Sequence, residues 1–269
     1  MSKGVLYDGN RCIGCRSCQV ACKSWNENEA EETTSKGVYD NPPHLSARTF
    51  TMMRFREVEY EGKFHWAFAK TQCMHCLHPA CVTACPVGAL QKDKDKGPVV
   101  YDDSRCFGCR YCMVACPFGI PTFQWDNPLP WIRKCSFCAD RLGGGLKPAC
   151  VTACPTGALQ FGEREELITE AHERINGSNG KYVDHVYGEK EAGGTSWLYI
   201  SPVPMEELGF PILGEEAATE NPHIAMRALP YYAAGVTVLM AGFYWLTKRR
   251  QKLNQGEQDN QGEKEEVTK

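Results

Sequence analysis

The chain has 269 residues, a formal net charge of −3 at pH 7 and a pI near 6.2. This charge gives no electrostatic basis for binding nucleic acid, and the length allows one large domain or two small ones. Cysteine is unusually abundant at 16 residues, an even number for which a disulfide framework must be considered.

Twelve of the sixteen cysteines lie in two passages that each occur twice. Residues 11–22, RCIGCRSCQVAC, return at 105–116 as RCFGCRYCMVAC, and PACVTACPVGALQ at 79–91 returns at 148–160 with one change. Three of the four runs end in Cys-Pro, and their spacing is typical of bacterial ferredoxin sites, where three thiolates hold one cube and the fourth reaches a neighbouring cube. The runs are Cys12, Cys15, Cys18, Cys22; Cys73, Cys76, Cys81, Cys85; Cys106, Cys109, Cys112, Cys116; and Cys135, Cys138, Cys150, Cys154.

Two other uses of these cysteines are disfavoured by the spacing. Disulfide scaffolds seldom repeat a three-residue cysteine step, which metal sites need in order to aim thiolates at one centre. Zinc is the stronger alternative, because paired Cys-x2-Cys elements build zinc ribbons, but zinc has no use for a third and fourth thiolate in the same loop. The runs therefore predict 4Fe–4S clusters.

The flanking strands predict how the runs pair. The chain's first strand, residues 5–8, has the sequence pattern of residues 99–102 before the third run. After the second run, residues 88–91 and 99–102 flank a Gly-Pro turn and predict a hairpin, which joins the second and third runs. After the fourth run, residues 157–161 lack a following partner, so we expect them to pair with residues 5–8.

This pairing nests one ferredoxin-like unit around the other. The first and fourth runs form a unit over about 1–22 and 126–165, and the second and third runs form a unit over about 73–125. Exchange of the fourth ligand, as in two-cluster ferredoxins, then gives four predicted sites. They are site 1 (Cys12, Cys15, Cys18, Cys154), site 2 (Cys22, Cys135, Cys138, Cys150), site 3 (Cys73, Cys76, Cys81, Cys116) and site 4 (Cys85, Cys106, Cys109, Cys112).

Residues 23–72 form an insertion between the first two runs. Alternation over 49–58, a turn at Glu61-Gly62 and a second apolar run at 64–68 predict a β-hairpin that covers clusters or docks a partner subunit. His75 and His78, inside the second run, are expected to donate hydrogen bonds to cluster sulfur. Residues 163–175 predict a short helix whose apolar face packs on the core. The fold class is therefore α+β.

One C-terminal segment is predicted to cross a membrane. Residues 228–247 carry no formal charge and span roughly 30 Å as a helix, the thickness of the hydrocarbon core. We place the domain of four clusters at 1–225, the transmembrane helix at 226–249 and a disordered tail at 250–269. Four basic residues follow the helix and only Arg227 precedes it closely, so the positive-inside rule places the tail in the cytoplasm and the cluster domain outside it.

The N-terminal residues MSKGVLYDGNR contain neither an apolar signal region nor a twin arginine. Clusters are assembled in the cytoplasm, so the folded domain is expected to cross the membrane with a partner subunit that carries the export signal.

The chain resembles the four-cluster iron–sulfur subunits of membrane-bound molybdopterin oxidoreductases. It is most similar to the beta subunit of respiratory formate dehydrogenase in CIGCRSCQVACKSWNE at 12–27, GVYDNPPHLSARTFTMMRF at 37–55 and KPACVTACPTGALQFG at 147–162. CMHC at 73–76, CRYCMVACPFGIP at 109–121 and HVYGEKEAGGT at 185–195 resemble the iron–sulfur subunit of a membrane-bound nickel–iron hydrogenase. Those subunits usually carry an export signal, so formate dehydrogenase is favoured.

The resemblance implies a function without catalysis by this chain. Electrons from a molybdenum or tungsten pterin subunit would pass one at a time through four 4Fe–4S clusters to a membrane cytochrome b or quinone-reactive subunit. Nitrate-reductase relatives have tryptophan in place of one cysteine of the third run and hold a 3Fe–4S cluster, whereas this chain has Cys109. A zinc-stabilised membrane adaptor without redox activity is the alternative from a different class.

Overall fold

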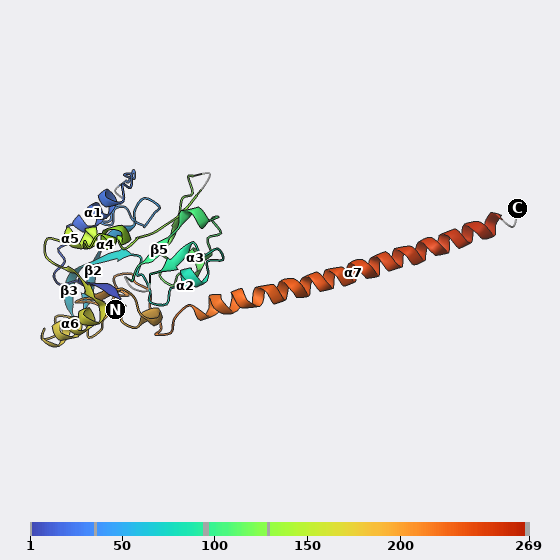
Figure 1. The fold of residues 1–269 in the computed structure, drawn as a ribbon. Helices are drawn as coiled ribbons and strands as arrows, with labels where there is room; N and C mark the ends of the chain where they lie inside the picture. The colour runs from blue at the N-terminus through green and yellow to red at the C-terminus, as the bar shows by residue number, and fades with distance from the viewer. Residues whose placement is uncertain (1, 35–36, 94–96, 128–129, 267–269) are drawn as a thin grey trace. The chain divides into compact units, whose positions relative to one another are not determined.

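The computed structural model describes residues 2–34, 37–93, 97–127 and 130–266. The chain divides into two compact units, Met1–Pro222 and His223–Lys269. In the first unit, short strands and short helices alternate along the chain, and the second unit is part of one long helix (Figure 1).

A three-stranded sheet joins the two ends of the first unit. Its order is β8 (Leu159–Glu163), β1 (Lys3–Asp8) and β9 (Trp197–Ile200), with β1 antiparallel to β8 and parallel to β9. The expected pairing of residues 5–8 with the strand after the fourth cysteine run is confirmed. The parallel pairing of β9 with β1 was not predicted.

Three antiparallel strand pairs complete the sheet structure. The longest joins β2 (Thr51–Tyr60) to β3 (Lys63–Gln72) through Glu61 and Gly62, both of which have positive φ. As expected, β4 (Leu90–Lys92) pairs with β5 (Val99–Tyr101); residues 94–96 of the intervening turn lie outside the described residues. The pair of β6 (Thr122–Phe123) and β7 (Ile132–Arg133) was not predicted. It joins residues on the two sides of residue 125, where the unit of the second and third runs was expected to end.

Short helices lie within or directly beside the cysteine runs and contain five of the sixteen cysteines. A nine-residue helix, α1 (Ser17–Trp25), contains the end of the first run, and α4 (Ala139–Gly143) follows Cys138 directly. The two copies of PACVTAC form equivalent four-residue helices, α2 (Ala80–Thr83) and α5 (Ala149–Thr152), each preceded by an extended proline. The third run contains α3 (Tyr111–Ala115), which follows the 3₁₀ turn η1 (Asp103–Arg105); a second such turn, η2 (Glu191–Gly193), precedes β9.

The helix predicted after the fourth run is present as α6 (Arg164–Asn176). Its apolar side chains Leu167, Ala171 and Ile175 are buried and pack with Leu6 and Leu198 of the three-stranded sheet. The spacing of these three residues places them on one helical face, so the prediction that this stripe packs on the core is confirmed.

The cysteines are part of the core rather than its margin. In the residues that the structure describes, three of the four hydrophobic core clusters contain buried cysteines. The largest of them also contains Tyr7, Trp197 and Tyr199, which are almost completely buried. Metal ligation and hydrophobic packing therefore involve the same part of the molecule.

The C-terminal helix α7 (Glu220–Glu266) contains Pro230 and one stretch, Arg227–Asn254, that is long and apolar enough to cross a bilayer. The structure differs here from the disordered tail expected over 250–269, because α7 continues to Glu266. The residues after 250 are rich in Gln, Glu and Lys, which have high helix propensity and extend a helix that has already formed. Residues 267–269 lie outside the described part.

Candidate metal centres

Sites 1 and 4 each enclose a small cavity. The cavity at site 1 is lined by Cys12, Cys15, Cys18 and Cys154, together with Tyr7, Met53 and other residues. The cavity at site 4 is lined by Cys85, Cys106, Cys109 and Cys112, together with Phe107, Ile132 and other residues. Each cavity thus brings together three thiols of one run and one thiol of a distant run.

The thiols of sites 2 and 3 are identified as neighbours by their effect on one another's ionisation. At site 2, burial and then Cys22 raise the pKa of Cys135, and Cys150 raises the pKa of Cys22 and of Cys138. At site 3, burial and then Cys73, Cys116 and Cys81 raise the pKa of Cys76. The structure therefore brings the four thiols of site 1 and the four of site 4 to a common cavity, and it places thiols of the predicted sites 2 and 3 near one another. The assignment of all sixteen cysteines as ligands stays a prediction.

Thiols of different sites also raise one another's pKa, and the pairs that do so connect the four sites in a single order. Cys150 of site 2 contributes to the raised pKa of Cys18 of site 1, after burial. In the same way Cys73 of site 3 acts on Cys135 of site 2, and Cys112 of site 4 acts on Cys81 of site 3. These three pairs connect the sites in the sequence 1, 2, 3, 4.

The first Cys-x2-Cys step of each of the four runs has the same backbone conformation. The residue before the second cysteine has positive φ in every run: Gly14 at 65°, His75 at 50°, Gly108 at 77° and Phe137 at 58°. This conformation turns the chain so that the flanking thiols face the same side. Within these loops the amide of Gly14 donates to Cys12 Sγ at 3.5 Å, and the amide of Phe137 donates to Cys135 Sγ at 3.3 Å.

Burial opposes ionisation of the thiols when no metal is bound. It raises the pKa of Cys18, Cys22, Cys81 and Cys112 to about 12. Iron ligation requires thiolates, and a bound metal cation supplies the positive charge that stabilises them in a buried position. The donor set fits iron–sulfur clusters in this respect.

Two buried donors without protein partners fit the same group. His75 is completely buried, its Nδ1 accepts the Val99 amide at 2.8 Å, and its Nε2 has no partner in the described part of the chain. Burial, and then Lys134 and Lys92, lower the pKa of His75, so the ring is neutral and its Nε2 carries the proton. Among the described residues the Trp197 indole N–H has no partner either, and sulfur atoms of a cluster can accept from both groups. His78, by contrast, is exposed, which does not support its expected role as a donor to buried sulfur.

The spread of the thiols can be compared with the needs of a single ion and of a cube. Among the residues that the structure describes, no three His, Cys, Asp or Glu side chains converge closely enough to hold one metal ion. A mononuclear zinc site draws its ligands around one point, whereas a cube takes one thiolate at each of four separate iron atoms.

Sequence reasoning missed three lysines close to the cysteines. Lys70 and Lys134 are buried and Lys92 is half-buried. Lys134 Nζ donates to the carbonyl oxygens of Val99 and Cys135, and Lys92 Nζ donates to the carbonyl oxygen of His75 at 3.1 Å. The one signal available in the sequence was the position of Lys70, which closely follows the apolar run predicted as a strand at 64–68.

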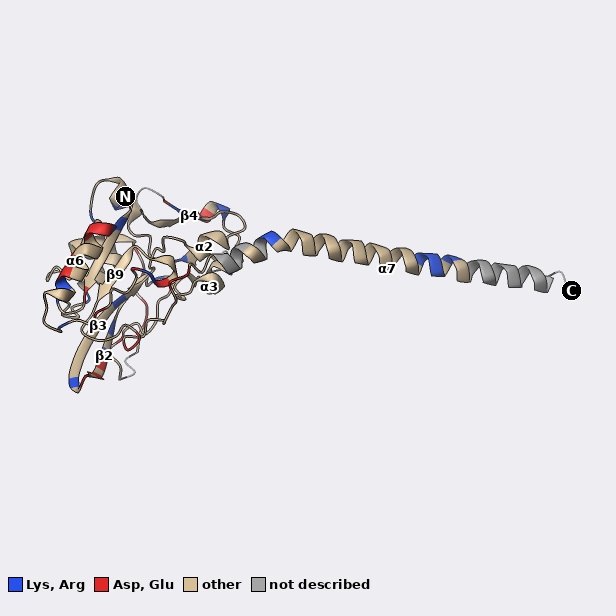
Figure 2. Cartoon of the chain, turned by 90° about the horizontal axis from the view of Figure 1, so that it is seen from below, with Lys and Arg blue, Asp and Glu red and all other residues tan. Residues whose placement is uncertain are grey.

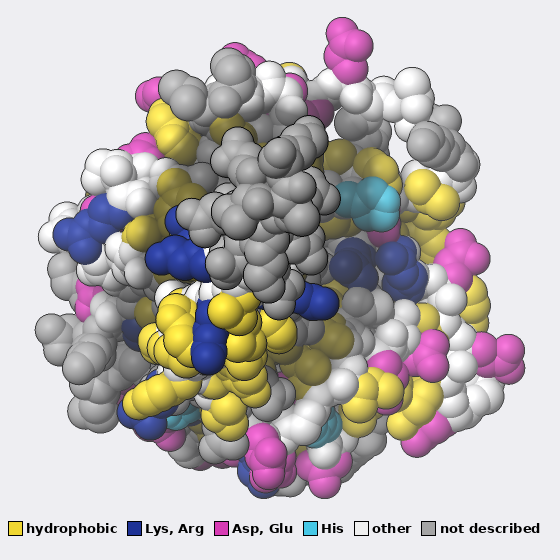
Figure 3. Space-filling model, turned by 90° about the vertical axis from the view of Figure 1, so that its right-hand side faces the viewer, with side chains coloured by type: hydrophobic (Ala, Val, Ile, Leu, Met, Phe, Trp, Pro, Cys, Tyr) yellow, Lys and Arg dark blue, Asp and Glu magenta, His cyan; other side chains and the backbone are white. Residues whose placement is uncertain are grey.

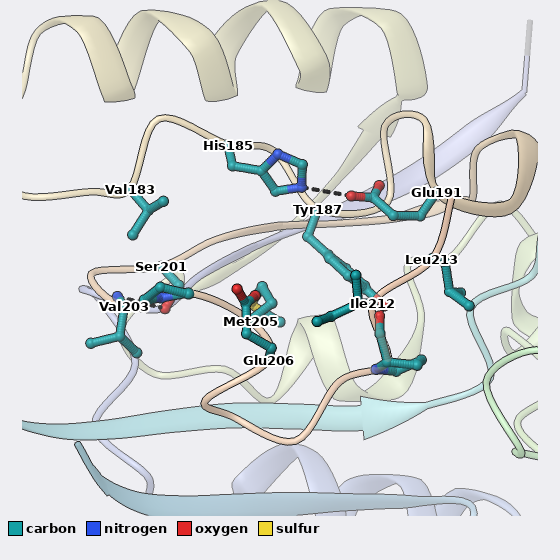
Figure 4. Close-up of a pocket in the computed structure, with 12 residues that line it drawn as sticks. Val183, His185, Tyr187, Glu191, Ser201, Val203, Met205, Glu206, Ile212 and Leu213 are labelled. Carbon is teal, nitrogen blue, oxygen red and sulfur yellow. Dashed lines mark hydrogen bonds and ion pairs between the residues drawn. The ribbon is translucent and has the colours of Figure 1, made fainter. Parts of the chain in front are cut away.

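A larger cavity of about 320 Å³ lies apart from the cysteines (Figure 4). His185 Nε2 and Glu191 Oε1 are 2.6 Å apart at its rim, and the second oxygen of Glu191 accepts the Gly188 amide. No cysteine lines this cavity. His185 and Glu191 are thus engaged within the fold, and no cysteine of the four sites is part of this cavity.

Comparison with known proteins agrees with this geometry. Two family models, each described as a 4Fe-4S dicluster domain, match residues 64–164 and 11–89, and together they contain all sixteen cysteines. The nitrate-inducible formate dehydrogenase iron-sulfur subunit of Escherichia coli K12 is 41% identical over 197 residues, which cover 72% of this chain and 66% of that subunit. The chain thus matches slightly less than two-thirds of the length of that relative.

Two other relatives match more of the chain. The hydrogenase-2 operon protein HybA of Escherichia coli O157:H7 is 38% identical over 279 residues, which cover 89% of this chain and 84% of HybA. A protein of Nitratidesulfovibrio vulgaris is 44% identical over 261 residues, which cover 96% of this chain and 70% of that protein.

Proposed function

The chain belongs to the family of 4Fe–4S iron–sulfur subunits of membrane oxidoreductases, and on this premise we propose that it holds four clusters, one at each of sites 1 to 4, in two nested ferredoxin-like units. Bound clusters of this kind carry one electron at a time, and the chain positions them and adjusts their potentials. The ligands proposed are the sixteen cysteines in the sets given above.

The observation that carries the proposal is the order in which the four sets of thiols act on one another. Neighbouring sets are connected by Cys18 with Cys150, Cys135 with Cys73 and Cys81 with Cys112. Sites 1 and 4 are therefore the ends of the series. A relay requires such a series, in which each centre is close to the next and two centres are accessible to partners.

The two end sites have apolar surface beside them. Ile13 is 60% exposed at site 1, and Phe107 is 65% exposed at site 4. Exposed apolar side chains at these positions favour contact with partner subunits. We assign one end to a molybdenum or tungsten pterin subunit that oxidises formate, and the other end to a cytochrome b or quinone-reactive subunit in the membrane.

Hydrogen is the second candidate for the electron source. The relative from the hydrogenase-2 operon covers 89% of this chain, whereas the formate dehydrogenase subunit covers 72% at slightly higher identity. The iron–sulfur subunit of a membrane-bound nickel–iron hydrogenase therefore remains the alternative assignment.

We propose that α7 anchors the protein in the cytoplasmic membrane by a single pass. Its apolar side chains are exposed to solvent, among them Leu239, Phe243 and Trp245, and exposed apolar side chains are visible on the face drawn in Figure 3. The Lys and Arg residues at 248–252 form the blue segment of α7 in Figure 2 and favour a cytoplasmic C-terminus, which places sites 1 to 4 on the opposite side.

The test is to purify the intact complex from membranes under anaerobic conditions. We expect four cluster signals in electron paramagnetic resonance of the reduced protein. We also expect formate to reduce the clusters that give these signals. Reduction by hydrogen but not by formate would favour the hydrogenase assignment. Stoichiometric zinc in place of iron would refute the proposed function.

A further inference from the structure

Lys70 is a buried cation without a carboxylate partner. It lies in β3 and is 1% exposed. Its Nζ donates to Gln72 Oε1 at 2.9 Å and lies 4.3 Å from the centroid of the Trp197 ring. Within the described residues, no carboxylate oxygen lies at ion-pair distance from Lys70.

One amide oxygen and one aromatic face are weak compensation for a fully desolvated ammonium group. A buried charge is costly unless an opposite charge lies nearby. The Trp197 ring under the Lys70 ammonium packs in the same core cluster as Cys18 of site 1 and Cys150 of site 2, so the nearby groups that can become anionic are cysteines. In agreement with this geometry, Lys70 opposes the effect of burial on the pKa of Cys18, Cys22 and Cys135. Cys18 belongs to site 1, and Cys22 and Cys135 belong to site 2.

The position of the ammonium group is fixed by a buried hydrogen-bond chain. Gln72 Nε2 donates to the Tyr199 hydroxyl at 2.5 Å, and that hydroxyl donates to the Lys70 carbonyl oxygen at 2.9 Å. Tyr199 and Gln72 are both buried. The charge therefore stays between two sets of thiols and cannot move to solvent.

We propose that the Lys70 ammonium is the fixed counter-charge of sites 1 and 2 and raises the reduction potentials of the clusters held there. The inference rests on the proposed function. Adding an electron makes a thiolate-ligated cluster more negative, so a nearby positive charge stabilises the reduced form more than the oxidised form. We expect a smaller effect at sites 3 and 4, because Lys134 is the lysine that opposes the effect of burial on the pKa of Cys81.

The experiment is a redox titration of the purified complex, monitored by electron paramagnetic resonance. The signals of sites 1 and 2 are assigned by their loss in Cys154→Ser and Cys22→Ser. In Lys70→Met we expect the equilibrium constant for reduction at these two sites to fall at least tenfold, which is about 59 mV for one electron. Lys70→Arg keeps the charge and is expected to stay within that margin of the wild type.

A matched control is Lys92→Gln. Burial lowers the pKa of Lys92, and the charges that oppose this effect are those of Cys76 and Cys73 at site 3. We therefore expect this variant to shift the site 3 signal and to leave sites 1 and 2 unchanged. An equal shift of all four signals in Lys70→Met, or no shift at sites 1 and 2, would overturn the proposal.

Iron analysis keeps the proposal testable if Lys70→Met assembles poorly. Loss of iron in Lys70→Met and Lys70→Gln, with retention in Lys70→Arg, would support the requirement for a positive charge. Loss of iron in all three variants would refute the proposal, because cluster assembly would then require the size and shape of the lysine side chain and not its charge. Absence of the four signals from the wild-type complex would instead count against the proposed function.

Discussion

Val5 lies opposite Phe161 in the antiparallel pair of β1 and β8. This pairing joins the beginning of the chain to the strand that follows the fourth cysteine run. Cys12 comes shortly after β1 and Cys154 shortly before β8, so the same pairing brings both cysteines to site 1. Two residues that are distant in the sequence thus decide which thiols share a site.

The exchange of the fourth ligand predicts which cluster each cysteine variant loses. Cys22→Ser should remove the signal of site 2 and keep that of site 1, although Cys22 belongs to the first run. Cys154→Ser should do the reverse and remove the signal of site 1. Iron analysis and electron paramagnetic resonance of the two variants check both outcomes. Loss of the site 1 signal alone in Cys22→Ser would contradict the assignment.

Gly14→Ala should destabilise site 1 for two separate reasons. The residue has φ of +65°, and a Cβ there would lie 2.9 Å from Phe55 Cε1 and 3.0 Å from Phe68. A left-handed alanine costs about 1–2 kcal/mol, and overpacking costs about 1–3 kcal/mol more. The control is Gly88→Ala, which has φ of +63° and open space around the added Cβ. Urea unfolding of the two variants should show the larger loss in Gly14→Ala; equal losses would exclude a steric contribution.

Asp8→Ala should lower the unfolding free energy by about 1–3 kcal/mol, because the partly buried Arg174 and the Tyr182 hydroxyl each lose a hydrogen-bond acceptor. Asp8 is fully buried, and its carboxylate binds the Arg174 guanidinium at 2.8 Å and accepts from the Tyr182 hydroxyl at 3.0 Å. These bonds connect β1 to α6 and to the segment before β9. The exposed Asp184 serves as the control, since Asp184→Ala should change the stability by less than about 0.5 kcal/mol. Similar losses in both variants would contradict the role of Asp8.

The Tyr182 hydroxyl should make the stability depend on pH in the alkaline range. Burial and then the negative charge of Asp8 raise the pKa of Tyr182 above its ordinary value of about 10. A group whose pKa is raised on folding contributes stability that is present below the unfolded pKa and is lost as the pH rises through the folded pKa. The difference in unfolding free energy between the wild type and Tyr182→Phe should therefore be constant from pH 7 to about 9 and should decrease above about pH 10. A constant difference at all pH values would argue against this contribution.

Removing the iron should unfold the first unit rather than leave an intact empty protein. Buried cysteines belong to three of the hydrophobic core clusters in the described residues, and the mean hydropathy of the chain is low at −0.42. Metal binding and folding are coupled in such proteins. Anaerobic chelation, followed by near-ultraviolet circular dichroism, should show loss of the tertiary signal of the aromatic core. A cooperative thermal transition in the iron-free protein would contradict this expectation.

Much of the cysteine arrangement could be predicted because it depends on local spacing. Thiols three residues apart can face one centre only when the chain turns between them, and the repeats marked those turns. The similarity of residues 5–8 to residues 99–102 also gave the partner of β8, since a strand after the fourth run needed an antiparallel neighbour. The packing stripe of α6 followed from helical periodicity.

The sequence alone determined the number of cysteines, their division into four runs and the chemistry that such runs favour. Only the tertiary structure decided which groups lie between the runs. Lys70 is separated from Cys18 and Cys150 in the chain, and β9 supplies Trp197 from beyond α6. Local sequence patterns identify the candidate metal ligands. The charge and solvent exclusion around a metal centre depend instead on contacts between segments that are distant in the chain. For that reason the sequence could predict how the cysteines group, and it could not predict that the buried Lys70 lies near Cys18 and Cys150.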